Sequence, residues 1–127
     1  MVARSGKYPV VVTHVGVNDI GRRRSRELVQ KYQELLQCLK DTGRRCVVSG
    51  VLPRMGVGWE WTDSAREVNM IVGALCESIG IKFLDGWDNF YGRRHLYARD
   101  GLHLSREGVE MLSKLLEGAV EGLCQGN

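Results

Sequence analysis

The sequence predicts an α/β fold in which helices cover the faces of a parallel sheet. Two observations support this prediction. Short β-branched segments alternate with longer segments whose apolar residues recur at helical spacing, and the segments follow the order strand, helix, strand, helix, strand, loop, helix. Right-handed crossovers between the strands would place helices on both faces. The 127 residues suit one domain, so we expect residues 1–127 to form a single unit.

The first half of the chain contains two predicted strands and one predicted helix. Residues 9–15 (PVVVTHV) and 46–51 (CVVSGV) are β-branched runs, and Pro53 closes the second. Gly43 is placed to end the helix between them in a left-handed conformation. The apolar face of this helix, repeating at i, i+4, i+7 and i+8, consists of Leu28, Val29, Tyr32, Leu35, Leu36 and Leu39.

The second half contains two more predicted helices and a short strand. Ser64 and Glu67 form the capping-box pattern S-x-x-E, which predicts that a helix begins there and runs to a stop at Gly80. Residues 81–84 form the third strand, and an irregular stretch follows. Ser105 can cap the final helix, because a serine oxygen accepts hydrogen bonds from the first turn.

The first strand indicates that the sheet is truncated at the N-terminus. The unbroken run of valines over residues 10–12 suits a strand covered on both faces in the middle of a parallel sheet. Only three strands are predicted, and this most apolar one comes first. We therefore expect that neighbouring strands would precede it in a complete domain.

Composition and charge exclude several classes of protein. The net charge of +3 is too small to indicate nucleic-acid binding by itself. No apolar run is long enough to span a bilayer, and residues 1–8 lack the apolar region typical of a signal peptide. The four cysteines lack C-x-x-C pairing and indicate free thiols in a reducing, cytoplasmic compartment. No grouping has metal-ligand spacing and no glycine-rich phosphate loop occurs, so we expect neither a metal nor a cofactor.

The first candidate functional element is a loop, Gly16-Val17-Asn18-Asp19, directly after the first strand. Ligands bind at the carboxyl ends of the strands in open α/β sheets, so this loop lies where sites form. An asparagine there can direct its side-chain N–H at a developing oxyanion, a contact whose loss costs about 10²–10³ in turnover. The alternative is a plain turn, because glycine, asparagine and aspartate are ordinary turn residues.

The second candidate element, Asp100-Gly101-Leu102-His103, precedes the cap of the last helix. An acid and a base three residues apart can share one loop. The carboxylate then fixes the imidazole tautomer while the imidazole takes a proton from a hydroxyl. The alternative is that Asp100 starts a turn and His103 only precedes a helix.

Together, the two elements resemble two conserved blocks of the SGNH/GDSL hydrolases. Gly16-x-Asn18-Asp19 resembles their block III and Asp100-x-x-His103 their block V. Residues 47–53 resemble the strand between those blocks, and residues 87–104 are similar to esterase-like domains of vertebrate non-LTR retrotransposons. The resemblance implies a three-layer α/β/α sandwich of flavodoxin-like type and ester hydrolysis through an acyl-enzyme. It also implies Asn18 as an oxyanion-hole donor on a loop supported by Gly16 and Asp19, Asp100 as the orienting acid and His103 as the base.

The chain departs from this family at the nucleophile. Family members carry their serine in a Gly-Asp-Ser block after the first strand and an oxyanion glycine in block II, and this sequence contains neither block. Its seven serines all lack that context. We therefore interpret the chain as a partial domain without a nucleophile, and we expect negligible esterase activity from the chain alone.

Two other hypotheses stay open. Five arginines flank the two candidate loops and could bind the phosphates of RNA or of an anionic lipid, although an ordinary solvated surface is the simpler interpretation; they are Arg22, Arg23, Arg24, Arg93 and Arg94. Alternatively, the chain is an inactive remnant of a mobile-element protein, and an uncovered sheet edge would then favour self-association.

Overall fold

The described part of the chain folds around a four-stranded sheet. The computed structural model describes residues 2–5, 8–14, 25–43 and 45–125, and side chains over 26–122 except 28 and 44. The strands are β1 (Val2–Ser5), β2 (Tyr8–His14), β3 (Arg45–Ser49) and β4 (Lys82–Leu84), and this is also their order in the sheet. β2, β3 and β4 are parallel, whereas β1 pairs antiparallel with β2. The predicted parallel strands are therefore confirmed.

β1 is the part of the sheet that the sequence did not predict. It pairs with β2 from Val2 opposite Val11 to Ser5 opposite Tyr8. β2 consequently has a neighbour on each side, which fits the central position predicted from its run of valines. The neighbour on its outer side comes from this chain, so the expected sheet of three strands was wrong.

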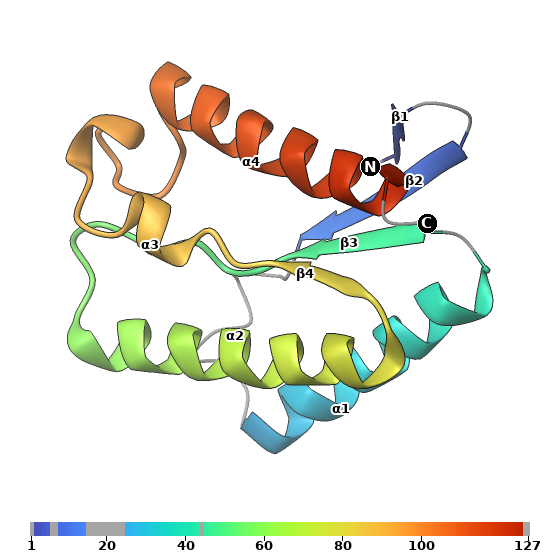
Figure 1. The fold of residues 1–127 in the computed structure, drawn as a ribbon. Coiled ribbons are helices and arrows are strands. Elements are labelled where there is room, and N and C mark those ends of the chain that lie inside the picture. Colours follow the sequence, from blue (N-terminus) through green and yellow to red (C-terminus); the bar gives the residue numbers. More distant parts are fainter. Residues whose placement is uncertain (1, 6–7, 15–24, 44, 126–127) are drawn as a thin grey trace.

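Helices cover both faces of the sheet, as predicted. α1 (Ser25–Asp41) and α2 (Trp59–Ile79) pack side by side on one face, and α4 (Arg106–Gln125) lies across the other (Figure 1). The short helices α3 (Trp87–Phe90) and η2 (Arg94–Leu96) occupy the stretch between β4 and α4. The architecture is a three-layer α/β/α sandwich whose parallel strands follow the order of the sequence.

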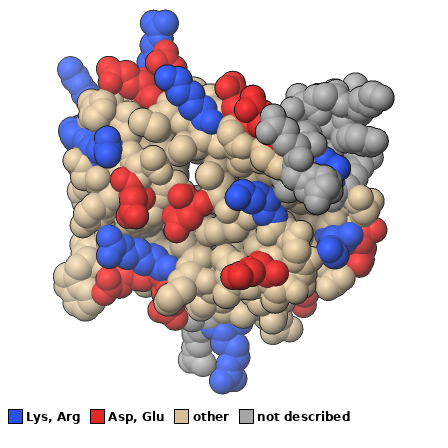
Figure 2. All heavy atoms as spheres, viewed as in Figure 1, with Lys and Arg blue, Asp and Glu red and all other residues tan. Residues whose placement is uncertain are grey.

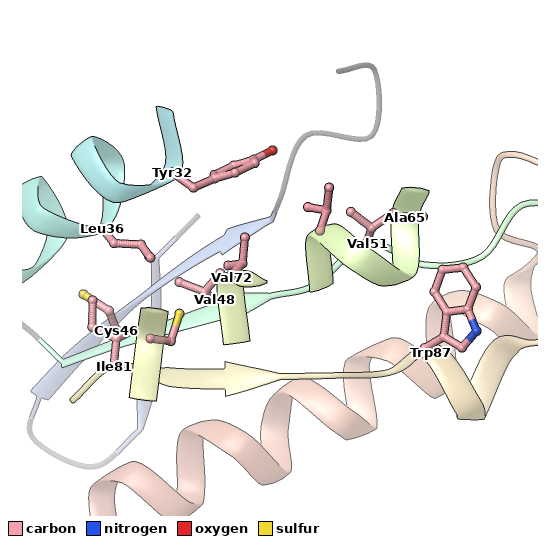
Figure 3. Packing of buried hydrophobic residues seen from close by; sticks show 11 residues of the cluster. Tyr32, Leu36, Cys46, Val48, Val51, Ala65, Val72, Ile81 and Trp87 are labelled. Atoms are coloured by element: carbon pink, nitrogen blue, oxygen red, sulfur yellow. The ribbon is translucent and has the colours of Figure 1, made fainter. Parts of the chain in front are cut away.

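Alternate residues of β3 build two separate hydrophobic cores. Cys46 and Val48 point toward α1 and α2 and pack with side chains from both helices, including Leu36 and Val72 (Figure 3). Val47, fully buried, packs on the opposite face against α4. This alternation follows from the period of two in a strand, whose successive side chains point to opposite faces.

The ends of the helices follow the predicted glycine and serine signals. Gly43 and Gly80 have φ angles of +70° and +77°, the left-handed conformation that ends a helix. Ser105 precedes α4, and its Oγ accepts the N–H of Gly108 at 3.2 Å. These three predictions are confirmed.

The predicted start of the second helix at Ser64 is wrong. α2 begins at Trp59 after Gly58, so Ser64 lies inside the helix. The apolar spacing extends further back than the capping-box motif, because Trp61 precedes Ala65 by four residues and packs against the same core. Burial of this additional turn outweighs a local capping pattern of about 1 kcal/mol.

A third core lies beyond the carboxyl end of the sheet, where the sequence predicted only an irregular stretch. Phe90, Leu96 and Tyr97 are buried there against apolar side chains from the β3–α2 segment and from the first half of α4. Asp85 accepts the N–H of Trp87 at 3.0 Å and so begins α3. This core fixes the backbone that leads into the loop of Asp100 and His103.

Candidate active site

Asp100 and His103 form a hydrogen-bonded acid–base pair within one loop. Oδ1 of Asp100 accepts the backbone N–H groups of Leu102 and His103, each at 2.9 Å. Oδ2 is hydrogen-bonded to Nδ1 of the His103 ring. The two backbone bonds hold the carboxylate so that its second oxygen faces the imidazole, and the structure thus brings together the two residues that the sequence singled out.

The electrostatics of the pair favour an ionised Asp100. The hydrogen bond from the His103 side chain, together with the N–H groups of His103 and Leu102, lowers the pKa of Asp100 from 3.8 to about 2. At neutral pH the carboxylate accepts a hydrogen bond from the Nδ1–H group, so in a neutral imidazole Nε2 is the nitrogen that carries the free lone pair. The His103 side chain is 77% exposed, which leaves Nε2 accessible to a second group.

Backbone hydrogen bonds close the loop into a compact unit. The N–H of Ala98 donates to the carbonyl of His103 at 2.8 Å, and the N–H of Gly101 donates to Ala98 at 3.0 Å. Tyr97 and Leu104 form an antiparallel bridge at its base. The loop therefore has a defined shape although the Asp100 and His103 side chains are both exposed to solvent.

Gly101 is required by both its conformation and its surroundings. Its φ angle is +72°, and a Cβ built on it would lie 2.8 Å from the carbonyl oxygen of Met55. The N–H of Met55 donates to the carbonyl of Gly101 at 2.9 Å. A glycine between the acid and the base thus allows the loop to pack directly on the segment that follows β3.

The pair lies at the carboxyl edge of the parallel strands. Met55 belongs to the segment that leaves β3 after Ser49, and His14, the last residue of β2, is paired with Ser49. Ligands bind at this edge in open α/β sheets. The predicted oxyanion donor Asn18 and the supporting residues Gly16 and Asp19 lie outside the described residues.

The serines with described side chains occupy structural positions. Ser49 is buried in β3, while Ser78 and Ser105 donate to backbone carbonyls at 2.7 and 2.6 Å. Ser64 and Ser113 lie inside α2 and α4. Among the residues with described side chains, each serine thus lies in a strand, lies in a helix or caps one.

The predicted basic rim is described only in part. The guanidinium of Arg94 donates to the carbonyls of Ala98 and Arg99 at 2.8 and 3.3 Å, so it holds the loop of the acid–base pair. Arg93 is exposed, and residues 22–24 lie outside the described residues. On the face drawn in Figure 2, basic and acidic side chains are interspersed.

Two residues that support the site were not predicted from the sequence. Tyr97 is buried, and its hydroxyl donates to the carbonyl of Pro53. Asn69 is buried in α2 and binds both the N–H and the carbonyl of Val51. The sequence did contain a signal for Asn69, because a polar residue at helical spacing from the apolar Ala65 and Val72 is expected to face the core and to need a hydrogen-bond partner there.

Comparison with known proteins finds relatives of this chain. The sequence model of the GDSL-like lipase/acylhydrolase family matches residues 3–111. Among curated proteins, no sequence matches the chain.

Solved structures match the fold. The esterase domain of the ORF1 protein from the zebrafish ZfL2-1 retrotransposon is 32% identical over 85% of this chain and 70% of its own, with a TM-score of 0.72. A putative acylhydrolase from Bacteroides fragilis (20% identity, TM-score 0.76) is matched over 90% of this chain and 62% of its own. An acetylxylan esterase from Geobacillus stearothermophilus (16% identity, TM-score 0.75) is matched over 87% of this chain and 58% of its own. The chain therefore spans less than two thirds of the length of the two bacterial structures.

Proposed function

Because the chain belongs to the GDSL-like lipase/acylhydrolase family, we propose that it supplies the acid and the base of an ester hydrolase. The observation that carries this proposal is the hydrogen bond between Asp100 and His103 in a loop at the carboxyl edge of the sheet. His103 acts as the general base through Nε2, and Asp100 orients the ring and stabilises the imidazolium that forms. Asn18 is the proposed oxyanion donor, on the predicted loop that also contains Gly16 and Asp19.

The chemistry of such a site is acyl transfer in two steps. Nε2 of His103 takes the proton of a serine hydroxyl while that oxygen attacks the ester carbonyl carbon. The imidazolium then returns the proton to the departing alkoxide, which leaves as an alcohol and leaves an acyl-enzyme. In the second step, water loses a proton to Nε2 and attacks the acyl carbon. The carboxylic acid is released as the serine oxygen regains its proton from the imidazolium.

The serine of this mechanism is proposed to come from a segment other than these 127 residues. Two observations support this. No serine in the sequence follows a Gly-Asp pair, and the structural neighbours are longer than the chain, which spans 58–70% of their length. The proposed activity accordingly belongs to a completed domain, and the chain by itself should hydrolyse esters no faster than background.

A chimera tests the proposal directly. The part of the zebrafish esterase domain that precedes its matched region is fused to this chain, and hydrolysis of p-nitrophenyl acetate is compared with that by the chain alone. We expect activity only in the chimera, and His103→Ala should lower kcat/KM by about 10²–10⁴-fold. His95→Ala is the matched control, because His95 is also exposed and lies eight residues earlier.

Two outcomes would contradict the proposal. One is a chimera that folds but shows no hydrolysis above background. The other is a chimera whose activity survives His103→Ala. Activity of the chain alone that His103→Ala abolishes would instead contradict only the proposed origin of the serine.

Binding of RNA or anionic lipid is an alternative hypothesis with weaker support, because Arg94 already holds the loop and charges of both signs are interspersed on the face drawn in Figure 2. Affinity for single-stranded RNA that falls steeply with added salt would favour it. The described part of the chain contains no helix suited to crossing a bilayer. Cytoplasmic location and self-association stay predictions.

A further inference from the structure

The hydroxyl of Tyr97 joins the loop of the acid–base pair to the segment that follows β3. Tyr97 is 5% exposed, and its hydroxyl donates to the carbonyl of Pro53, which is 44 residues away in the sequence. Its ring packs edge-to-face on Phe90, with centroids 6.2 Å apart. Burial raises the pKa of Tyr97 to about 12, so the phenol keeps its proton and remains a donor at neutral pH.

The segment that accepts this hydrogen bond is itself fixed. Asn69 Oδ1 accepts the N–H of Val51 at 2.7 Å, and its Nδ2 donates to the carbonyl of Val51 at 2.9 Å. The N–H of Gly50 donates to Leu84 in β4 at 2.9 Å. The carbonyl of Pro53, two residues after Val51, therefore belongs to a backbone segment that α2 and β4 hold in place.

The acid–base pair needs such an external connection. Within the described part of the chain, the hydrogen bonds of Asp100 join residues 100–103 to one another and do not reach the sheet. The Asp100 and His103 side chains are 49% and 77% exposed, so packing around them provides little restraint. The loop is tied to the segment after β3 through Tyr97 at its base and through Gly101 at its tip.

We propose that Tyr97 is a positioning residue for the Asp100–His103 pair, acting through the hydrogen bond from its hydroxyl to Pro53. Asn69 supports the same connection from the other end of the 50–55 segment. The hydroxyl holds the base of the loop in the geometry that lets Asp100 receive three hydrogen bonds. The catalytic meaning of this geometry rests on the proposed function, but the geometry itself can be measured without any activity.

The test is the carboxyl titration of Asp100, followed by ¹³C NMR in the chain and in Tyr97→Phe. The variant keeps the ring and loses only the hydroxyl. We expect the pKa of Asp100 to rise from about 2 toward its ordinary value of 3.8, because the loop relaxes and its hydrogen bonds lengthen. The Nδ1 proton of His103 should exchange faster with water in the same variant.

Two controls separate positioning from a general loss of stability. Tyr91→Phe removes the hydroxyl of an exposed tyrosine nearby and should leave the pKa of Asp100 at about 2. Leu36→Ala destabilises the core under α1. This helix lies on the other side of the sheet from α4 and away from the loop that leads into α4 (Figure 1), so the pKa of Asp100 should again stay unchanged. Asn69→Ala removes the hydrogen bonds to Val51 at the other end of the segment. This variant should raise the pKa of Asp100, as Tyr97→Phe does.

A pKa of Asp100 that stays at about 2 in folded Tyr97→Phe would overturn the inference. If Tyr97→Phe does not fold, Asn69→Ala decides by the same titration. An equal rise in Leu36→Ala would also overturn it, because the change would then report stability alone. Failure of the chimera to hydrolyse esters would leave this titration unaffected, so the two proposals fail separately.

Discussion

Asp100 uses its two carboxylate oxygens for different purposes. Oδ1 receives two backbone N–H groups and so sets the rotamer of the side chain, while Oδ2 receives the imidazole. A carboxylate that already accepts several N–H groups remains ionised in acid, which suits the role proposed for Asp100, the stabilisation of a positive charge on His103. The loop thereby places an acid beside a base with hydrogen bonds that are almost all local.

The stability of the chain should therefore depend on pH through Asp100. Its pKa is about 2 in the folded chain and 3.8 ordinarily, so the folded chain binds this proton more weakly than the unfolded chain. The stabilisation is complete above about pH 4 and disappears as the pH falls to about 2. Asp100→Asn has no carboxyl to titrate, so this pH-dependent stabilisation is absent at every pH. The Tm of the variant should therefore fall less between pH 5 and pH 2 than the Tm of the parent chain.

Leu102→Ala is the control for this measurement, because it keeps the N–H that Asp100 accepts and changes only an exposed side chain next to it. Its Tm should fall with pH as in the parent chain. Thermal unfolding followed by circular dichroism gives both values. An equal fall in Asp100→Asn and the parent would show that Asp100 titrates alike in folded and unfolded chains.

The sequence predicted the acid–base pair but not its supports, for a physical reason. Asp100 and His103 are three residues apart, so a local pattern contains their contact. Tyr97 and Pro53 are 44 residues apart, and only the folding of β3 and α2 brings them together. A hydrogen bond of this kind leaves no periodic trace in the sequence.

At the scale of the elements, periodicity predicted most of the helices and strands, and pairing decided the rest. β1 has only four residues, too few for an alternating pattern, and its place is set by its ladder with β2. α2 begins at Trp59 and not at the predicted Ser64, because the buried part of Trp61 extends the apolar face of the helix. Short elements and element ends depend on tertiary contacts that local motifs do not contain.

Two glycines of α4 should respond in opposite ways to the same substitution. A Cβ on Gly108 would lie 2.0 Å from the carbonyl oxygen of Leu96, so the first turn of α4 rests directly on the backbone of η2. Gly108→Ala should force these elements apart and cost about 1–3 kcal/mol. A Cβ on Gly118 meets nothing within 4 Å. Gly118→Ala should therefore stabilise the helix by about 0.5–1 kcal/mol.

Denaturant titration of the two variants measures both changes against the parent chain. Because the substitution and the helix are the same, helix propensity cancels in the comparison and the contact with Leu96 remains. Gly108→Ala should also disturb the acid–base loop, since Ser105 donates its N–H to the same carbonyl at 2.9 Å. A stabilising Gly108→Ala would show that α4 does not approach η2 this closely.

At the scale of the whole molecule, β3 couples the two faces of the sandwich. Val48 belongs to the core under α1 and α2, and Val47 belongs to the core under α4. Neighbouring residues of one strand thus anchor opposite layers, and neither layer can lose its packing without exposing the strand that the other requires. We expect the chain to unfold as one unit.

Adjacent leucines of α1 test this coupling. Leu36 is 1% exposed in the core under α1, while Leu35 is 37% exposed on the outside of the same helix. Leu36→Ala should cost about 2–5 kcal/mol and Leu35→Ala well under half of that, because only the first leaves a cavity. If β3 couples the layers, Leu36→Ala lowers the midpoints of near-ultraviolet and far-ultraviolet circular dichroism together, although α4 lies on the opposite face of the sheet (Figure 1). A far-ultraviolet transition in two steps, an early loss of helix followed by a second step at the parent midpoint, would mean that α4 and the sheet form a unit without α1.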